Sequence, residues 1–159
     1  HLGNSEVMLI GAGEMSRITA QSLVSRGARS IFVANRSHDR AIELAAEMGG
    51  SAVTFDDWHR VLERVDVVIS STGSPHTIVH RADIEKARRA RKFRPLFLID
   101  IAVPRDIEPA AGEIEEVYLY DIDTLEQIAE GARTRRQEQI RECERIIDAE
   151  LAKTPFAGS

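Results

Sequence analysis

Near the start of the chain stands the run Val7-Met8-Leu9-Ile10-Gly11-Ala12-Gly13-Glu14-Met15-Ser16, an apolar segment followed by a glycine-rich turn. The pattern predicts a buried strand that turns through two glycines into a helix. Gly11 can adopt backbone angles that a side chain forbids, and Gly13 allows the main chain to approach a ligand closely. Because free N–H groups and the positive dipole end of a helix attract anions, this turn predicts a site for the pyrophosphate of a dinucleotide.

The segments that follow complete a unit of strand, helix and strand. Apolar residues recur with helical spacing from Ile18 to Val24, Gly27 provides a helix stop, and Ile31 to Ala34 has the pattern of a second strand. This context supports the prediction, because a GxGxxG motif alone is weak and Ser16 stands here in place of its third glycine.

The residues after the second strand indicate which dinucleotide is bound. An NAD-binding chain usually carries Asp or Glu at this point to hold the ribose 2′-hydroxyl, whereas this chain has Asn35-Arg36-Ser37. A guanidinium forms charge-assisted contacts with a phosphate that a carboxylate would repel, so the sequence favours NADPH over NADH. The alternative is that Arg36 is a solvated arginine at the start of the next helix, with Ser37 as its N-cap.

Strands and helices continue to alternate as far as residue 122. Helices are expected at His38–Met48 and Arg81–Ala90, with a small helix around Trp58, and further strands at Ala52–Thr54, Val65–Ser70, Leu96–Ile101 and Val117–Tyr120. This alternation predicts an α/β fold in which residues 1–122 form a Rossmann-type, doubly wound parallel sheet. The small polar loop Ser70–Pro75 follows a buried strand, where it would lie against a cofactor.

From Asp123 the pattern changes to that of a long C-terminal helix, expected to run to about Leu151. Its second half carries an apolar stripe with helical spacing, formed by Ile140, Cys143, Ile146, Ile147 and Leu151. We expect a partner helix to cover this stripe, because a monomer of this size has nothing else to cover it; the alternative is that this end of the helix frays in solution. Residues 152–159 are expected to form a disordered tail.

The composition limits the class of protein. A chain of 159 residues with 43% hydrophobic content can form one ordinary domain plus an appendage. The net charge of −5 argues against a surface that is generally coated with nucleic acid. A single cysteine excludes an internal disulfide framework, and the absence of a long apolar run argues against a membrane span, so a cytoplasmic setting is expected. The chain begins with His1, and we expect it to be a piece of a longer protein.

Four segments together resemble the NADPH-binding domain of the glutamyl-tRNA reductase family. They are Gly11–Met15, Val33–Ser37, Ile69–Pro75 and, most specifically, Arg94–Asp106 followed by Val117–Asp123. The resemblance covers Val7 to Leu151 and includes the long helix, which resembles the start of the helix that leads to the family's dimerisation region. It implies an NADPH-dependent reduction of glutamyl-tRNA to glutamate-1-semialdehyde in tetrapyrrole synthesis, by a homodimer formed through this helix in the intact enzyme.

The resemblance also implies roles for individual residues. Residues that would wrap the pyrophosphate are Gly11, Ala12, Gly13, Glu14, Met15 and Ser16, and those that would hold the 2′-phosphate are Asn35, Arg36 and Ser37. The ribose and phosphate on the nicotinamide side would lie beside Ser71, Thr72 and Gly73, and the nicotinamide would be bordered by Ile101, Ala102 and Val103. Ser16 in place of glycine would either weaken cofactor binding or donate its hydroxyl to a phosphate. Glu14 is more readily interpreted as a residue that complements the helix dipole.

The family's nucleophilic cysteine would lie in an N-terminal domain outside this sequence. The apolar neighbours of Cys143 in the predicted helix indicate a small packing residue, so no catalytic residue is expected here and this piece alone is expected to be inactive. The histidines lack ligand spacing supported by carboxylates or thiols, and no metal site is expected.

Two other features leave alternatives open. The basic stretch Arg81–Arg94 could contact tRNA phosphates, although a solvated helix face is the default interpretation. Asp100, at the end of a strand, could perturb a proton transfer or simply hydrogen-bond the loop that follows it.

Two other classes of protein also fit the glycine turn. One is another NADP-dependent reductase, such as a shikimate-dehydrogenase-like protein, and the other is a non-catalytic nucleotide-sensing or oligomerisation module.

Overall fold

The computed structural model describes residues 5–28, 30–121, 123 and 136–153. Within these residues, six parallel strands form one sheet in the order β3-β2-β1-β4-β5-β6. The strands are β1 (Glu6–Ile10), β2 (Ser30–Ala34), β3 (Ser51–Val53), β4 (Val67–Ser70), β5 (Leu96–Asp100) and β6 (Val117–Asp121). The chain leaves β1 toward β2 on one side and returns beside it as β4, and this change of direction is where open α/β sheets bind ligands.

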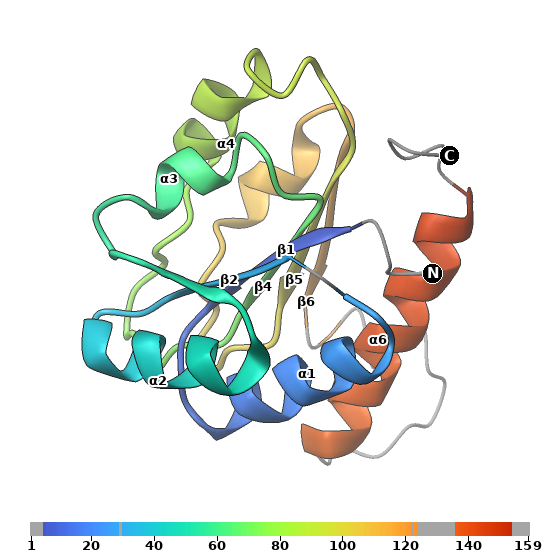
Figure 1. Cartoon of the computed structure of the whole chain (residues 1–159). Coiled ribbons are helices and arrows are strands. Elements are labelled where there is room, and N and C mark those ends of the chain that lie inside the picture. The colour runs from blue at the N-terminus through green and yellow to red at the C-terminus, as the bar shows by residue number, and fades with distance from the viewer. Residues whose placement is uncertain (1–4, 29, 122, 124–135, 154–159) are drawn as a thin grey trace.

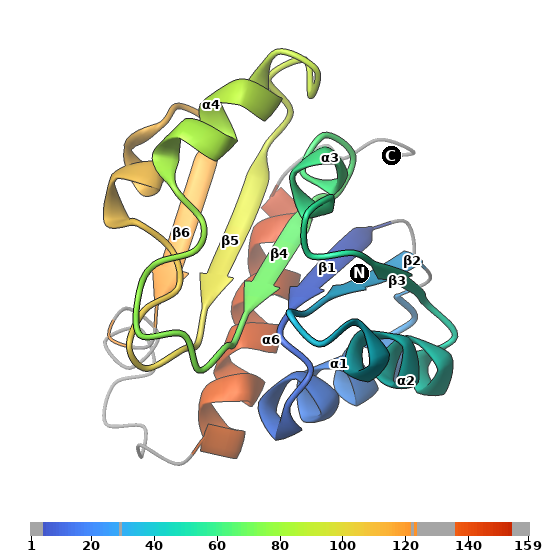
Figure 2. The ribbon, with the colours of Figure 1, turned by 90° about the vertical axis from the view of Figure 1, so that its left-hand side faces the viewer.

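Helices cover both faces of the sheet (Figures 1 and 2). One face carries α1 (Glu14–Ser25), α2 (His38–Met48) and α6 (Arg136–Lys153), and the other carries α3 (Trp58–Val61), α4 (Arg81–Arg88) and the short 3-10 helix η1 (Pro109–Glu113). The predicted α/β fold, with a doubly wound parallel sheet and a C-terminal helix, is confirmed.

Each strand contributes to two separate hydrophobic cores because successive side chains point to opposite faces. In β1, Val7 and Leu9 pack under α1, α2 and α6, whereas Met8 and Ile10 pack under α3, α4 and η1. All four side chains are fully buried. This explains why the strand has an uninterrupted apolar sequence rather than an alternating one.

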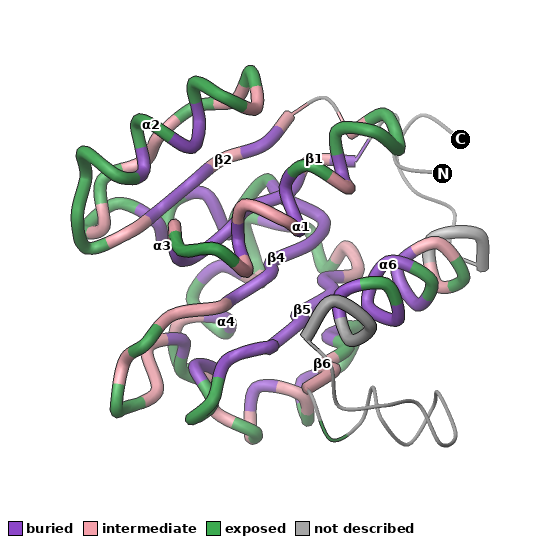
Figure 3. The backbone as a smooth tube through the Cα atoms, turned by 90° about the horizontal axis from the view of Figure 1, so that it is seen from below, coloured by how far each residue is buried: buried purple, intermediate pink, exposed green. Residues whose placement is uncertain are grey.

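The C-terminal helix α6 packs on the sheet. Ile140, Cys143, Ile146 and Ile147 are at most 7% exposed and belong to the same core as α1 and β5. Figure 3 shows the buried side of α6 facing the sheet. The expectation that the chain itself has nothing to cover these four residues was therefore wrong, because α1 and α2 leave the face of β5 and β6 free for a third helix. The side chain of Leu151, the fifth residue of the predicted stripe, lies outside the described part of the structure.

Ion pairs fix the position of α6 against the end of α1. The Arg26 guanidinium donates to Glu144 at 2.8 Å and also contacts Asp148 one turn further along. Opposite charges on neighbouring helices thus reinforce the apolar contact.

Several boundaries differ from those expected. Helix α6 continues to Lys153, so the first two residues of the tail expected at 152–159 are helical. Residues 154–159 and the segment 124–135, within the predicted long helix, lie outside the described residues.

The predicted helix His38–Met48 is confirmed, with Ser37 as its N-cap and Gly49 at a positive φ of 69° as its C-cap.

No helix among the described residues has the length and apolar character required to cross a bilayer.

Candidate functional site

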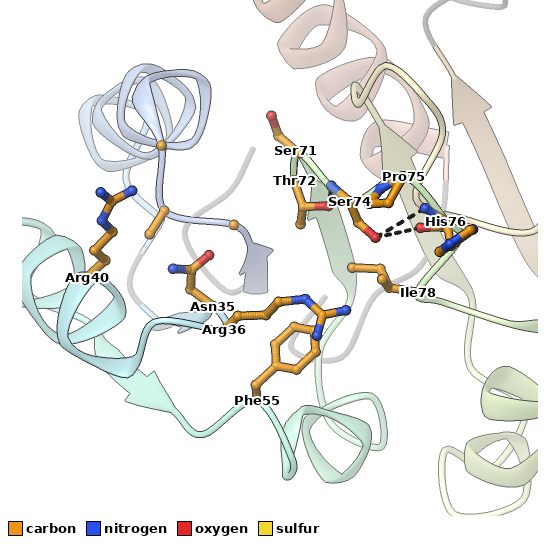
Figure 4. Close-up of a pocket in the computed structure, with 14 residues that line it drawn as sticks. Asn35, Arg36, Arg40, Phe55, Ser71, Thr72, Ser74, Pro75, His76 and Ile78 are labelled. Atoms are coloured by element: carbon orange, nitrogen blue, oxygen red, sulfur yellow. Dashed lines mark hydrogen bonds between the residues drawn. The ribbon is translucent and has the colours of Figure 1, made fainter.

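A cavity of about 590 Å³ lies at the carboxyl end of the sheet, where β1, β2 and β4 end (Figure 4). Four segments far apart in the sequence form its walls: the β1–α1 turn, the start of α2, the loop after β3 and the loop after β4. The lining residues are Gly11, Ala12, Gly13, Asn35, Arg36, Arg40, Phe55, Ser71, Thr72, Gly73, Ser74, Pro75, His76 and Ile78. Its position matches the ligand crevice of a doubly wound sheet.

The glycine turn forms one wall of this cavity. Gly11 has φ +112°, and a Cβ at this position would lie 2.9 Å from the carbonyl carbon of Ser71 and closer still to its oxygen. Only glycine allows β1 and the loop after β4 to approach so closely. A Cβ at Gly13 would meet nothing within 4 Å, so the side of the turn at Gly13 is open.

Helix α1 begins at this turn. Gly13 is its N-cap, and no side chain among the described residues hydrogen-bonds to the cap. The first N–H groups of α1 are therefore placed as an anion-binding helix start requires.

The start of α2 supplies positive charge to the cavity. Figure 4 shows Arg36 extending across the ring of Phe55 toward the loop after β4, and the guanidinium carbon lies 4.9 Å from the ring centroid. This cation–π contact restricts the guanidinium before any ligand binds. Arg40 lines the same cavity from the first turns of α2. Among the residues that the structure describes, two guanidinium groups and no carboxylate line this cavity, and this lining suits a phosphate.

The loop after β4 forms the opposite wall. The Ser74 hydroxyl donates to the carbonyl oxygen of His76 at 2.8 Å and accepts the His76 N–H at 3.3 Å, so the loop is closed on itself. The N–H and the hydroxyl of Thr72 donate to the buried carboxylate of Asp106 at 2.8 and 2.5 Å.

The structure brings eight of the predicted site residues together and places the others elsewhere. Lining the cavity are Gly11, Ala12, Gly13, Asn35, Arg36, Ser71, Thr72 and Gly73. Glu14 is exposed and Met15 packs partly against the core. Ser16 is only 2% exposed and lies beneath the turn, with its hydroxyl close to Gly11.

Ser37 also lies outside the cavity lining. Its hydroxyl accepts the N–H of Arg40 at 3.5 Å, and its carbonyl oxygen accepts a hydrogen bond from Asn35. The capping role of the alternative interpretation is therefore present, while Arg36 still reaches the cavity.

The segment predicted to border a nicotinamide follows β5 and does not line this cavity. Ile101 and Ala102 are each 4% exposed, whereas Val103 is 72% exposed. Ala102 and Val103 line a smaller cavity of about 340 Å³ with Arg105 and Asp123.

Ser74 and Pro75 also line the cavity and belong to the loop Ser70–Pro75 that the sequence predicted to lie against a cofactor. Sequence reasoning missed four lining residues: Arg40, Phe55, His76 and Ile78. Arg40 stands one helical turn after Arg36 on the helix predicted at His38–Met48, and that spacing could have identified it. Phe55 gave no such signal, because its position depends on how the loop after β3 turns back toward β2.

Asp100 lies at the end of β5 and is buried. Its carboxylate accepts the N–H groups of Ala102, Asp106 and Ile107 at 3.1, 2.9 and 2.8 Å. Burial raises the pKa of Asp100 to about 6, against the lowering effect of these hydrogen bonds. The interpretation in which Asp100 hydrogen-bonds the loop after it is confirmed.

The basic stretch Arg81–Arg94 is largely engaged within the molecule. Arg81 pairs with Glu85 and Glu113, and Arg94 pairs with Asp66. Arg91 is 2% exposed and donates to backbone carbonyl oxygens, and its burial lowers its pKa to about 10. It is a structural residue that the sequence pattern did not distinguish from the others.

Cys143 is buried at 1% exposure, and burial raises its thiol pKa well above the usual range. It is a packing residue, as expected. Within the described part of the chain, no cluster of three or more His, Cys, Asp or Glu side chains is arranged to hold a metal ion.

The fold and the cavity define a dinucleotide-binding domain of the open α/β type. The family model described as Shikimate / quinate 5-dehydrogenase matches residues 1–128, and the chain belongs to this family.

Within this family, the chain is similar to glutamyl-tRNA reductases, and the resemblance inferred from the sequence is confirmed. It is 49% identical over 152 residues to the glutamyl-tRNA reductase of Akkermansia muciniphila, covering 96% of this chain and 45% of that protein. The solved structure of the glutamyl-tRNA reductase from Methanopyrus kandleri superposes with a TM-score of 0.76 and 44% identity, covering 96% of this chain and 38% of that one. The chain thus spans less than half the length of these relatives.

A solved shikimate dehydrogenase from Aquifex aeolicus also matches, with a TM-score of 0.58 and 20% identity over 90% of this chain and 55% of that one. At that identity the likeness shows only a shared fold.

Proposed function

We propose that this chain is the NADPH-binding domain of a glutamyl-tRNA reductase. The intact protein would reduce glutamyl-tRNA to glutamate-1-semialdehyde in porphyrin biosynthesis. It would act in the cytoplasm as a homodimer, and the helix that includes α6 would lead to its dimerisation region. The relatives support the activity, and one structural observation supports the cofactor: Arg36 lies inside the cavity, where an NAD-binding protein would carry an acid.

The cavity fits NADPH on three independent grounds. The side of the turn at Gly13 is open, α1 presents an N-terminus without a side-chain cap, and Arg36 and Arg40 supply charge for a 2′-phosphate. When bound, NADPH would supply the hydride for the reduction. Gly11–Gly13 would hold the pyrophosphate, and Ser71 and Gly73 the ribose beyond it.

The segment Ile101–Val103 would border the nicotinamide end. This assignment is supported by the position of the segment, which directly follows β5, the strand next to β4 in the sheet. The exposed side chain of Val103 would then lie at the outer side of the cofactor.

The test is a titration of the chain with NADPH and with NADH, followed by nicotinamide fluorescence. Wild type should bind NADPH more tightly, and Arg36→Ala should weaken NADPH binding by about 10- to 100-fold, the effect of one charge-assisted hydrogen bond. NADH binding should change much less, because NADH lacks the 2′-phosphate. Arg36→Asp should abolish or reverse the preference.

Arg64→Ala is the matched control. Its guanidinium also lies 4.9 Å from a ring centroid, that of Phe32, but outside the cavity. Equal affinity of wild type for NADPH and NADH, or no binding at millimolar concentration, would refute the proposal.

A further inference from the structure

Two buried carboxylates lie beneath the cavity and belong to segments that do not line it. Asp100 ends β5, Asp106 follows six residues later, and they are 1% and 0% exposed. Burying a carboxylate is unfavourable unless hydrogen bonds replace its water. Their bonding partners therefore indicate what they hold in place.

The Asp106 carboxylate accepts three hydrogen bonds from the end of β4 and the loop that follows it. One oxygen accepts from the Ser70 hydroxyl at 2.7 Å and the Thr72 N–H at 2.8 Å. The other oxygen accepts from the Thr72 hydroxyl at 2.5 Å. Thr72 thus donates its only hydroxyl proton inward, away from any ligand.

The backbone of Asp106 holds the far end of the same wall. Its carbonyl oxygen accepts the N–H groups of Ile78 and Val79 at 2.7 and 3.0 Å. Ile78 and Thr72 both line the cavity, so Asp106 fixes the loop after β4 at both of its ends. Asp100 in turn accepts the N–H of Asp106 and secures the segment itself.

A carboxylate is the only side chain of this size that accepts all three of these hydrogen bonds. Three donors point at its two oxygens, and an asparagine offers a single acceptor oxygen with an NH₂ group beside it. An asparagine that keeps the Ser70 hydroxyl and the Thr72 N–H on its single oxygen would turn its NH₂ group toward the Thr72 hydroxyl, which would then accept instead of donate and would no longer hold its proton inward.

We propose that Asp106 is a positioning residue for the cofactor: through the Thr72 N–H and hydroxyl it fixes the wall of the NADPH cavity opposite Arg36, and the Thr72 hydroxyl anchors this wall instead of donating to the cofactor. The inference depends on the proposed function, because it assumes that NADPH occupies this cavity.

The test compares four single variants of the 159-residue chain and the double variant Asp106→Asn/Thr72→Val. Asp106→Asn and Thr72→Val each remove the contact between the carboxylate and the hydroxyl, whereas Thr72→Ser keeps the hydroxyl. Asp66→Asn is the control, because Asp66 is also a buried carboxylate that accepts a backbone N–H, from Glu6 at 3.1 Å, but it lies at the opposite end of β4. NADPH affinity is measured by fluorescence at a temperature where circular dichroism shows every variant to be folded.

Asp106→Asn and Thr72→Val should each weaken NADPH binding by about tenfold, and the double variant by little more than either alone, because both remove one shared contact. Thr72→Ser and Asp66→Asn should bind NADPH within about twofold of wild type, even where Asp66→Asn lowers the melting temperature. If Asp106→Asn does not fold, Thr72→Val against Thr72→Ser gives the same comparison.

If Asp106→Asn or Thr72→Val binds NADPH as tightly as wild type, this inference is overturned while the proposed function stands. The same follows if Asp66→Asn or Thr72→Ser loses as much NADPH affinity as those two variants. Failure of wild type to bind NADPH would overturn the proposed function together with it.

Discussion

At the scale of single residues, the two glycines of the first turn have different roles. A side chain at Gly11 would collide with the backbone of Ser71 and would require a positive φ, whereas Gly13 has ordinary backbone angles and open space beside it. Gly11→Ala should lower the free energy of unfolding by about 2–5 kcal/mol. Gly13→Ala should change the free energy of unfolding by no more than about 1 kcal/mol but weaken NADPH binding about tenfold, because its methyl group enters the cavity.

Urea unfolding and NADPH titration of both variants distinguish these roles. Equal stability of the two variants would contradict the assignment of Gly11 to strand packing.

Asp100 should make the stability of the domain dependent on pH. Burial raises its pKa from 3.8 to about 6, so the native state binds this proton more tightly than the unfolded state does. Its contribution to stability is therefore fully present below about pH 4 and is lost as the pH rises to about 6. Relative to Asp100→Asn, which does not titrate, wild type should lose stability across that interval and show a constant difference above it.

Urea unfolding at half-unit pH steps gives this difference directly. The comparison is made between pH values because the substitution also disturbs the N–H groups of Ala102, Asp106 and Ile107 and removes a charge near Asp106. A difference independent of pH would contradict the raised pKa.

At the scale of elements, the docking of α6 on the sheet can be tested through Ile147, which is 2% exposed. Ile147→Ala should lower the free energy of unfolding by about 2–4 kcal/mol, through lost burial and the cavity left behind. The control is Arg141→Ala, at an exposed position of the same helix, with an expected change within about 0.5 kcal/mol.

Unfolding is followed at several protein concentrations to separate packing within the chain from association. If α6 were stabilised only by a partner helix, the effect of Ile147→Ala would vary with protein concentration.

Local pattern predicted most of the elements, because strands buried on both faces and helices with caps carry their signals within a few residues. The helix His38–Met48 is the clearest case, with Ser37 before it and Gly49 after it. The covering of the α6 stripe could not be predicted in this way. It depends on the width of the sheet that α1 and α2 leave uncovered, and a sequence pattern shows an apolar face without showing what lies against it.

In the candidate site, too, the residues with a local sequence signal were predicted and those that depend on contacts between distant segments were not. The glycine turn and Arg36 were predicted because each follows directly from a strand end in the sequence. Phe55 and Asp106 were not, because Phe55 contacts Arg36 and Asp106 contacts Thr72 across distant segments. Arg91 was misjudged for a related reason: only the folded chain shows that backbone carbonyl oxygens from Leu62 and Val65 surround it.

At the scale of the whole molecule, the cavity exists only when four separated segments are assembled around the end of the sheet. A ligand that fits it binds the native state and not the unfolded chain, and so stabilises the fold by mass action. At 100 times its dissociation constant, NADPH should add about 2.7 kcal/mol and raise the melting temperature by about 5–10 °C. NADH at the same concentration should raise the melting temperature less, and in Arg36→Ala the two shifts should become similar. A thermal unfolding series with both nucleotides measures this, and equal shifts in wild type would show that the guanidinium over Phe55 does not discriminate between them.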